Sequence, residues 1–154
     1  MKHDPKVAKA LNHLLADGTV FYQKLRHYHW NVEGHDFFEL HAKFEELYSA
    51  WAVHIDAIAE RIRAVQAVPL HTLAVVLKAA RLDEDDTIPP ATEMVEVVVT
   101  DLESLQGAVA EVIKAADHAG DRGTAHLMDD LGESLEKSLW MLRSWKRESA
   151  RTWS

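Results

Sequence analysis

The sequence contains no cysteine and few of the residues that interrupt regular structure. Without cysteine among its 154 residues, the chain forms no disulfide and offers no thiolate to a metal, which fits a reducing compartment. It has only six glycines and four prolines, so long elements joined by few turns are expected. No apolar run approaches the roughly 20 residues that span a bilayer, and no signal-peptide core follows the polar start. These absences predict a cytoplasmic protein without a membrane segment.

The chain is acidic and rich in histidine. Acidic side chains outnumber basic ones by 25 to 17, which gives a net charge of −8 with the ten histidines neutral. Such a charge attracts cations and disfavours non-specific binding to nucleic acid. The hydrophobic share of 47% and the charged share of 27% are ordinary for a globular protein, and the length fits a single domain, residues 1–154.

Apolar residues recur with the period of an α-helix along most of the chain. Asn31 and Gly34 mark the end of the first predicted helix, and Pro69 stops the second. The β-branched run 95–99 would also suit a strand, but the apolar pattern continues beyond it to Ile113, so we predict a helix. Four long helices form an all-α fold, an antiparallel four-helix bundle. Their predicted ranges are about 4–32, 36–65, 90–120 and 123–149.

A short extra helix is expected between the second and third long helices. Thr72 is a suitable cap for a helix over residues 72–80. An acidic joint that contains prolines follows at residues 83–90. No internal repeat, linker or low-complexity segment divides the chain, which agrees with a single domain.

Two pairs of metal-binding side chains lie on the second predicted helix. His41 and Glu45 are four residues apart, and so are Asp56 and Glu60. Residues at this spacing share a helix face, and at about 100° per residue the four side chains fall within an arc of roughly 100°. Imidazole nitrogen together with several carboxylate oxygens is the ligand set of non-haem iron and manganese sites.

The two pairs are too far apart to hold one ion within a single chain. His41 and Asp56 are separated by fifteen residues, which is about 22 Å along a helix. However, the midpoint of His41 and Glu60 coincides with that of Glu45 and Asp56. Two copies of this helix that cross antiparallel at that midpoint would bring the pair of one copy opposite the complementary pair of the other. A two-fold interface repeats each contact, so the spacing suggests two equal metal sites between subunits.

Another interpretation remains open at this point. Pairs of acidic and histidine residues at this spacing are common on solvated helix faces, and Glu60 has Lys43, Arg61 and Arg63 as candidate ion-pair partners. An iron site inside one bundle would need the motif Glu-x-x-His on two helices, and the chain does not contain it. The motif's absence disfavours a site within one chain but does not by itself establish one between chains.

The segment that contains these residues resembles the signature of a known family. The shared features are the run His29-Trp30-Asn31, Gly34 and Phe37-Phe38 before Leu40-His41, the spacing from His41 to Asp56, and the run Ala59-Glu60-Arg61. This pattern is similar to that of the Dps family, the miniferritins also called DNA-binding proteins from starved cells. A weaker likeness extends over all four predicted helices, so the resemblance implies a ferritin-like bundle.

The resemblance implies a metal site shared by two subunits. In this sequence the family's ligands fall on His29 and His41 from one subunit and on Asp56 and Glu60 from its two-fold mate. Glu45 stands where the family has an acidic residue, usually aspartate. The resemblance therefore implies the same pairing of subunits that the spacing suggests.

The resemblance also implies an activity and an assembly. Dps proteins form hollow homo-dodecamers in bacteria and archaea, oxidise Fe(II), preferably with hydrogen peroxide rather than oxygen, and store the ferric product. Iron is thus the expected metal, with zinc as a second candidate. Trp30 falls on a tryptophan beside the family's site, where it would be either a core aromatic or a redox-active, radical-quenching residue.

Residues near the start of the last helix bear on how iron enters. In the family, acidic residues there line pores on three-fold axes. Asp117 and Asp121 match this acidic pattern. Arg122 and His126 stand where other members carry aspartates. Asp129 or Asp130 could replace them in the lining of the pore. Helix caps and solvated charges explain such residues equally well, so the lining of a pore stays open.

DNA binding is not expected despite the family's name. Members that bind DNA usually carry a mobile lysine-rich tail. Here the first residues offer only Lys2 and Lys6, and the last offer Lys146, Arg147 and Arg151. A shell of chains with net charge −8 repels phosphate. A nucleoid-associated DNA-binding protein with little iron chemistry is the alternative function, and a helical oligomer without chemistry is a third.

Overall fold

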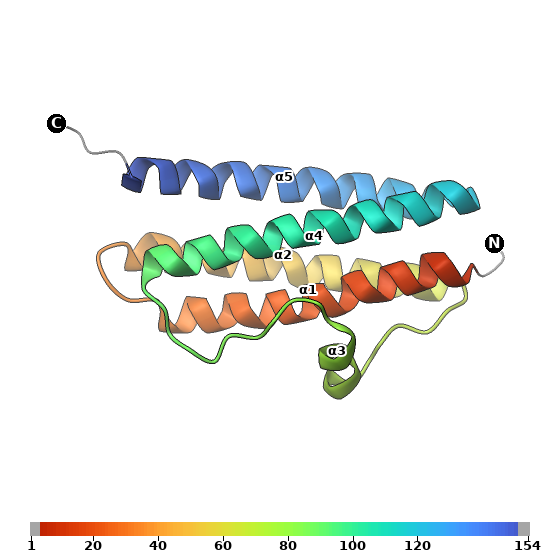
Figure 1. Ribbon diagram of the computed structural model, residues 1–154, viewed down its shortest axis with the longest axis horizontal. Helices are drawn as coiled ribbons and strands as arrows, with labels where there is room; N and C mark the ends of the chain where they lie inside the picture. Colours follow the sequence, from red (N-terminus) through yellow and green to blue (C-terminus); the bar gives the residue numbers. More distant parts are fainter. Residues whose placement is uncertain (1–3, 151–154) are drawn as a thin grey trace.

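The computed structural model describes residues 4–150, with side chains for residues 4–146, and this part of the chain folds into helices without a strand (Figure 1). Lys2 and Arg151, two of the terminal cations weighed for DNA binding, lie outside the described residues, as does the side chain of Arg147. The all-α bundle with one short extra helix is confirmed, and residues 95–99 are helical. The helices are α1 (Pro5–Asn31), α2 (Phe37–Ala64), α3 (Leu73–Ala79), α4 (Ala91–Ala119) and α5 (Arg122–Ala150).

Local chemistry sets the helix ends. The Asp4 carboxylate accepts hydrogen bonds from two amide N–H groups in the first turn of α1, and the Thr72 hydroxyl accepts one at the start of α3, as predicted. Gly120 ends α4 with a φ of 69°, a left-handed conformation that favours glycine. Gln66 adopts a similar φ of 68°, so α2 already ends ahead of Pro69. The backbone of Gln66, rather than the proline, therefore terminates α2.

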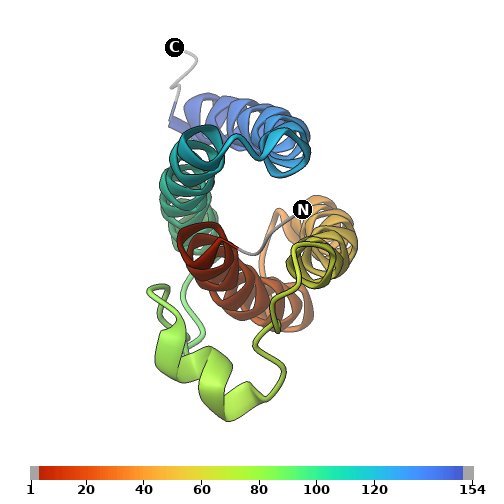
Figure 2. The ribbon, with the colours of Figure 1, turned by 90° about the vertical axis from the view of Figure 1, so that its right-hand side faces the viewer.

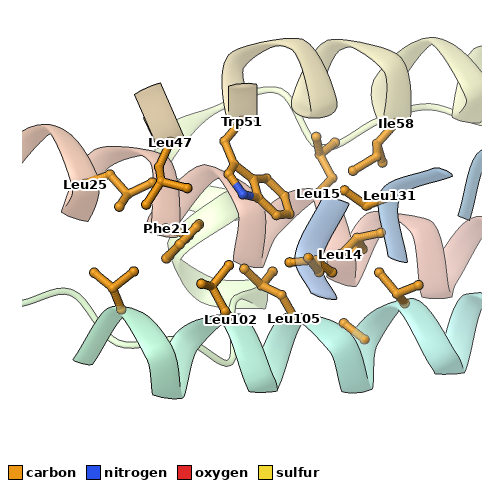
Figure 3. Packing of buried hydrophobic residues seen from close by; sticks show 14 of the residues in the cluster. Leu14, Leu15, Phe21, Leu25, Leu47, Trp51, Ile58, Leu102, Leu105 and Leu131 are labelled. Atoms are coloured by element: carbon orange, nitrogen blue, oxygen red, sulfur yellow. The ribbon is translucent and has the colours of Figure 1, made fainter. Parts of the chain in front are cut away.

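The four long helices form a curved row in the order α2, α1, α4, α5 (Figure 2). Large apolar side chains pack between the four long helices. This core includes Phe21, Trp51, Leu105 and Leu131, one from each of these helices (Figure 3). Trp51 meets the Phe21 ring edge-on at 5.5 Å, and a Cβ on Gly18 would lie 3.0 Å from the Trp51 ring. The absence of a side chain at Gly18 thus lets α1 and α2 approach closely.

Polar contacts fasten α4 and the segment after α3 to α1. Lys24 of α1 and Asp101 of α4 form a buried ion pair of 2.8 Å. Asp17 accepts hydrogen bonds of 2.6 and 3.1 Å from two backbone N–H groups just after α3. The Tyr28 hydroxyl donates to Asp85 in the acidic joint at 2.6 Å. These contacts fix the C-terminal part of α1, which carries the first predicted metal ligand.

Candidate metal centre

The imidazole side chains of His29 and His41 each form a hydrogen bond with the backbone of the other residue, near the junction between α1 and α2. The Nδ1 atom of His29 lies 2.7 Å from the carbonyl oxygen of His41, and the Nδ1 atom of His41 lies 2.7 Å from the carbonyl oxygen of His29. A carbonyl oxygen only accepts, so both Nδ1 atoms must carry a proton. In the neutral rings each Nε2 atom then has the free lone pair that a metal needs. The backbone thereby selects the tautomer that suits metal binding.

Aromatic neighbours fix the planes of both imidazole rings. The two rings stack with centroids 3.8 Å apart and planes 13° from parallel. Phe37 stacks on the outer side of His41 at 4.9 Å, and Tyr48 meets His29 edge-on at 5.3 Å. Tyr48 was missed from the sequence, although its place seven residues after His41 puts it on the same face of α2. Each imidazole is thus held by one backbone hydrogen bond and two ring contacts.

Glu45 completes this group within one chain. Its Oε1 atom lies 3.6 Å from Nε2 of His29. The Glu45 side chain is 58% exposed, whereas the His29 side chain is 9% exposed. The structure therefore brings together three of the predicted ligands, two buried or half-buried imidazoles and an exposed carboxylate at their edge. We call His29, His41 and Glu45 the histidine half.

Asp56 and Glu60 lie toward the other end of α2, and both are exposed. We call these two residues the carboxylate half. Within one chain, the described residues include no group of three or more histidine, aspartate or glutamate side chains arranged to hold a metal ion. The structure thus separates the two halves as the spacing required, and their meeting across two subunits stays a prediction.

The candidate cations do not neutralise Glu60. Arg61 pairs with Asp121 at 2.8 Å, and Lys43 pairs with Glu46 at 3.1 Å. Arg63 donates to the backbone carbonyl of Ala67, just beyond the end of α2, at 3.1 Å. Among the described residues no ion pair involves Glu60 or Asp56. The ion-pair interpretation of Glu60 is therefore wrong for the single chain.

Two other aromatic or histidine positions are settled by the fold. Trp30 is 57% exposed and lies 5.0 Å from the Arg26 guanidinium, so the core-aromatic interpretation is wrong for the single chain. His54 faces α5 rather than the His41 face of α2, with Nε2 3.4 Å from the Ser134 hydroxyl. Burial lowers the pKa of His54.

The residues considered for iron access surround a hollow of about 360 Å³ where α4 meets α5. Asp121 is buried and caps α5, because its carboxylate accepts from the Thr124 N–H at 3.0 Å and the Thr124 hydroxyl at 2.6 Å. Burial alone would raise the pKa of Asp121, but the hydrogen bonds from Thr124 and Arg61 outweigh it and lower that pKa. The helix-cap interpretation is therefore correct for Asp121. The exposed polar residues around the hollow are Asp117, Arg122, His126 and Asp129.

His126 and Asp130 are exposed side by side on the first turns of α5. Their side chains are 3.9 Å apart, and each is mostly in solvent. Asp130 does not line the hollow, whereas Asp129 does. In the single chain these residues behave as solvated surface charges.

Comparison with known proteins decides the family. The family model of the ferritin-like domain matches residues 8–151. The chain is 43% identical over 138 residues to the DNA protection during starvation protein of Brevibacillus brevis, which covers 90% of this chain and 93% of the relative. The chain belongs to the Dps family. A Dps crystal structure from Bacillus brevis agrees with this Dps chain at a TM-score of 0.88, with 42% identity and coverage of 90% and 93% of the two chains.

A second solved Dps structure links the family to metal chemistry. The Vibrio cholerae O1 protein shares 38% identity and a TM-score of 0.89, with coverage of 94% of this Dps chain and 97% of its own. That protein is described as a member of a broad superfamily of ferritin-like diiron-carboxylate proteins. No described helix of this Dps chain is long and apolar enough to cross a membrane.

Proposed function

We propose that this Dps protein oxidises Fe(II) at sites shared by two subunits and stores the ferric product inside a homo-dodecameric shell. The whole chain, residues 1–154, acts as one ferritin-like domain. Fe(II) is substrate and cargo, hydrogen peroxide is the preferred oxidant, and oxygen is the slower one. The protein thereby removes both reagents that generate hydroxyl radical in the cytoplasm under oxidative stress.

The main support for the proposal is the way in which the backbone fixes the rings of His29 and His41. Its backbone hydrogen bonds commit the Nε2 lone pairs of His29 and His41 to a ligand before any metal arrives. Glu45 adds a carboxylate beside them, and Asp56 and Glu60 offer two more on a free helix face. Nitrogen and carboxylate oxygen are donors that suit both Fe(II) and Fe(III), so the residues present fit the ion before and after oxidation.

The middle of α2 suits the required contact with a second copy. Ser49, Ala50, Ala52 and Val53 lie between the two halves, all are exposed, and none is large or charged. Small side chains let two helix backbones approach each other closely, so an antiparallel crossing here would bury this stretch. The same crossing would set the histidine half of each copy beside the carboxylate half of the other.

Two irons at one site explain the protective chemistry. Two Fe(II) ions each give one electron, and with two protons they reduce one hydrogen peroxide to two waters. A lone Fe(II) would supply only one electron and release hydroxyl radical. The protein's own contribution is to place donors for both ions within one site and to leave room for the oxidant.

Mixed assemblies test the shared site. One variant carries His29→Gln with His41→Gln, and the other carries Asp56→Asn with Glu60→Gln. Each alone should form shells but lose rapid peroxide-driven Fe(II) oxidation, followed by absorbance after anaerobic loading. Shells reassembled from both variants should regain activity, because a mixed dimer has one site with every ligand and one site that lacks both histidines and the carboxylate half.

Two outcomes would contradict the proposal. Mixed dimers that are shown to form yet stay as inactive as their parents would exclude a site between subunits. A stable monomer of the unaltered chain in light scattering would exclude both the shell and the shared site.

Protection of DNA, named in the Brevibacillus brevis relative, requires no DNA contact in this proposal. A chain of net charge −8 repels phosphate, so removal of Fe(II) and peroxide is the better-supported route. The nucleoid-associated alternative would need a basic surface to overcome that charge.

A further inference from the structure

Arg61 ties the carboxylate half of α2 to the start of α5. Its Nη2 atom donates to Asp121 at 2.8 Å, and its Nε atom donates to the Thr124 hydroxyl at 2.9 Å. The other hydrogen bonds between α2 and α5 among the described residues are 3.4 to 3.5 Å long. α2 and α5 stand at opposite ends of the curved row of helices, so this short, forked contact is their firmest polar link (Figure 2).

The partners of Arg61 are themselves fixed. Asp121 is only 3% exposed, and it also caps α5 through both the N–H and the hydroxyl of Thr124. The planar guanidinium meets this carboxylate and hydroxyl with two different nitrogens, a geometry that lysine cannot reproduce. Arg61 therefore binds to a preformed acceptor rather than to a mobile surface charge.

Gly123 leaves the space that the guanidinium occupies. A Cβ at Gly123 would lie 2.7 Å from Nη2 of Arg61 and 2.8 Å from its Cζ. Any side chain there would push the guanidinium off Asp121 or move α5. The contact thus depends on residues of both helices, because it needs an arginine on α2 and a residue without a side chain on α5.

We infer that Arg61 is a positioning residue for the carboxylate half of the metal site, a role that rests on the proposed function. Glu60 is the residue directly before Arg61, and Asp56 lies one turn earlier. Anchoring the backbone of α2 at Arg61 fixes the direction in which both exposed carboxylates leave the helix. Within the described part of the chain, the carboxylates have no hydrogen bonds to the backbone like those that fix the two histidine rings. Arg61 instead orients them indirectly, because it anchors this part of α2 to α5.

Binding of Co(II) alone, without oxidant, tests this role on the assembled protein. Arg61→Gln should weaken Co(II) binding about 10-fold or more, the usual cost of losing an outer partner of a metal ligand. Arg61→Lys keeps the charge but not the fork and should recover only part of the loss. Gly123→Ala keeps the arginine and should weaken binding in the same direction. Binding is followed by titration and by the visible spectrum of Co(II).

Two controls separate positioning from general stability. Arg63→Gln removes a neighbouring exposed cation that donates only to a backbone carbonyl, and its Co(II) affinity should match the unaltered chain. Val109→Ala opens the core in α4, and it should lower the melting temperature without changing Co(II) affinity. Light scattering confirms that all variants assemble alike.

The outcomes are distinct. Undiminished Co(II) affinity in Arg61→Gln, or a loss that Val109→Ala reproduces, overturns the positioning role while leaving the shared site intact. An unaltered chain that assembles but binds no Co(II) overturns the proposed site and this inference with it. A selective loss in Arg61→Gln and Gly123→Ala, with partial recovery in Arg61→Lys, supports the role.

Discussion

The two halves of the candidate site are built in opposite ways. In the histidine half, buried or half-buried rings are fixed by backbone carbonyls and ring stacking within one chain. In the carboxylate half, Asp56 and Glu60 are exposed and make no ion pair among the described residues. The first half is therefore part of the fold of the single chain, whereas in the proposed site the second half is completed only by another molecule. If the site is shared as proposed, one half of its ligands also stabilises the fold, whereas the other half serves only to bind metal.

The largest expected effect treats both halves alike. His41→Gln and Asp56→Asn should each slow peroxide-driven Fe(II) oxidation by more than about 100-fold, since losing a ligand costs at least as much as losing its outer partner. Stopped-flow absorbance measures the rate, and Glu46→Gln, an exposed change on the same helix, serves as the control. If Asp56→Asn oxidises iron at the unaltered rate, the carboxylate half does not belong to the site.

Substitutions in the two halves should differ in how much they lower the free energy of unfolding. His41→Ala removes the ring that donates to the His29 carbonyl and stacks on the His29 ring, so we expect a loss of about 1–3 kcal/mol. Asp56→Ala should change stability by less than about 0.5 kcal/mol, as for most exposed positions. Denaturant unfolding of the metal-free protein at one fixed concentration measures both. Equal losses would remove the distinction between a folded half and a functional half.

A smaller effect concerns the segment docked on α1 just before His29. Hydrogen bonds from Thr87 and Tyr28 lower the pKa of Asp85 to about 2, from 3.8 in an unfolded chain. A lowered pKa stabilises the fold at pH above about 3.8, and this contribution disappears as the pH falls through 2. Asp85→Asn should therefore be less stable than the unaltered chain at pH 5, and the difference should shrink toward pH 2. A difference that does not depend on pH would contradict this assignment.

The smallest expected effect is on DNA. At neutral pH and physiological salt, plasmid mobility in a gel should not change, because the chain carries a net charge of −8, to which the exposed carboxylates of both halves contribute. Clear retardation under these conditions would refute the prediction. Weak binding below about pH 6.5 would not, since histidines charge there.

The sequence predicted the fold well because each helix is encoded locally. Apolar period, Thr72 and Gly120 all act within a few residues, so the helix ends agree closely with the expected ones. The separation of the two halves also followed from spacing alone, since a helix has a fixed rise per residue. The end of α2 was also predicted to within one residue, but its cause was wrong, because the left-handed backbone of Gln66, rare for a residue other than glycine, ends the helix ahead of Pro69.

Contacts between distant segments could not be predicted. The link from Arg61 to Asp121 joins residues sixty positions apart, and only the packed bundle shows why Gly123 has no side chain. The exposure of Trp30 was equally undecided, because a helix buries or exposes a residue according to its neighbours. The tautomer of the histidine pair depends on two carbonyl positions at a helix junction, which no spacing rule specifies.

One rod, α2, carries both halves in its 28 residues. Two such rods that cross on a two-fold axis share a single crossing angle, and that one angle sets the geometry of both sites at once. In the proposed dimer, metal in one site would fix the crossing angle that the other site requires, so the first site to fill would order the interface for both. If the two sites are built as proposed, they should fill together, with a binding curve steeper than that of two independent sites.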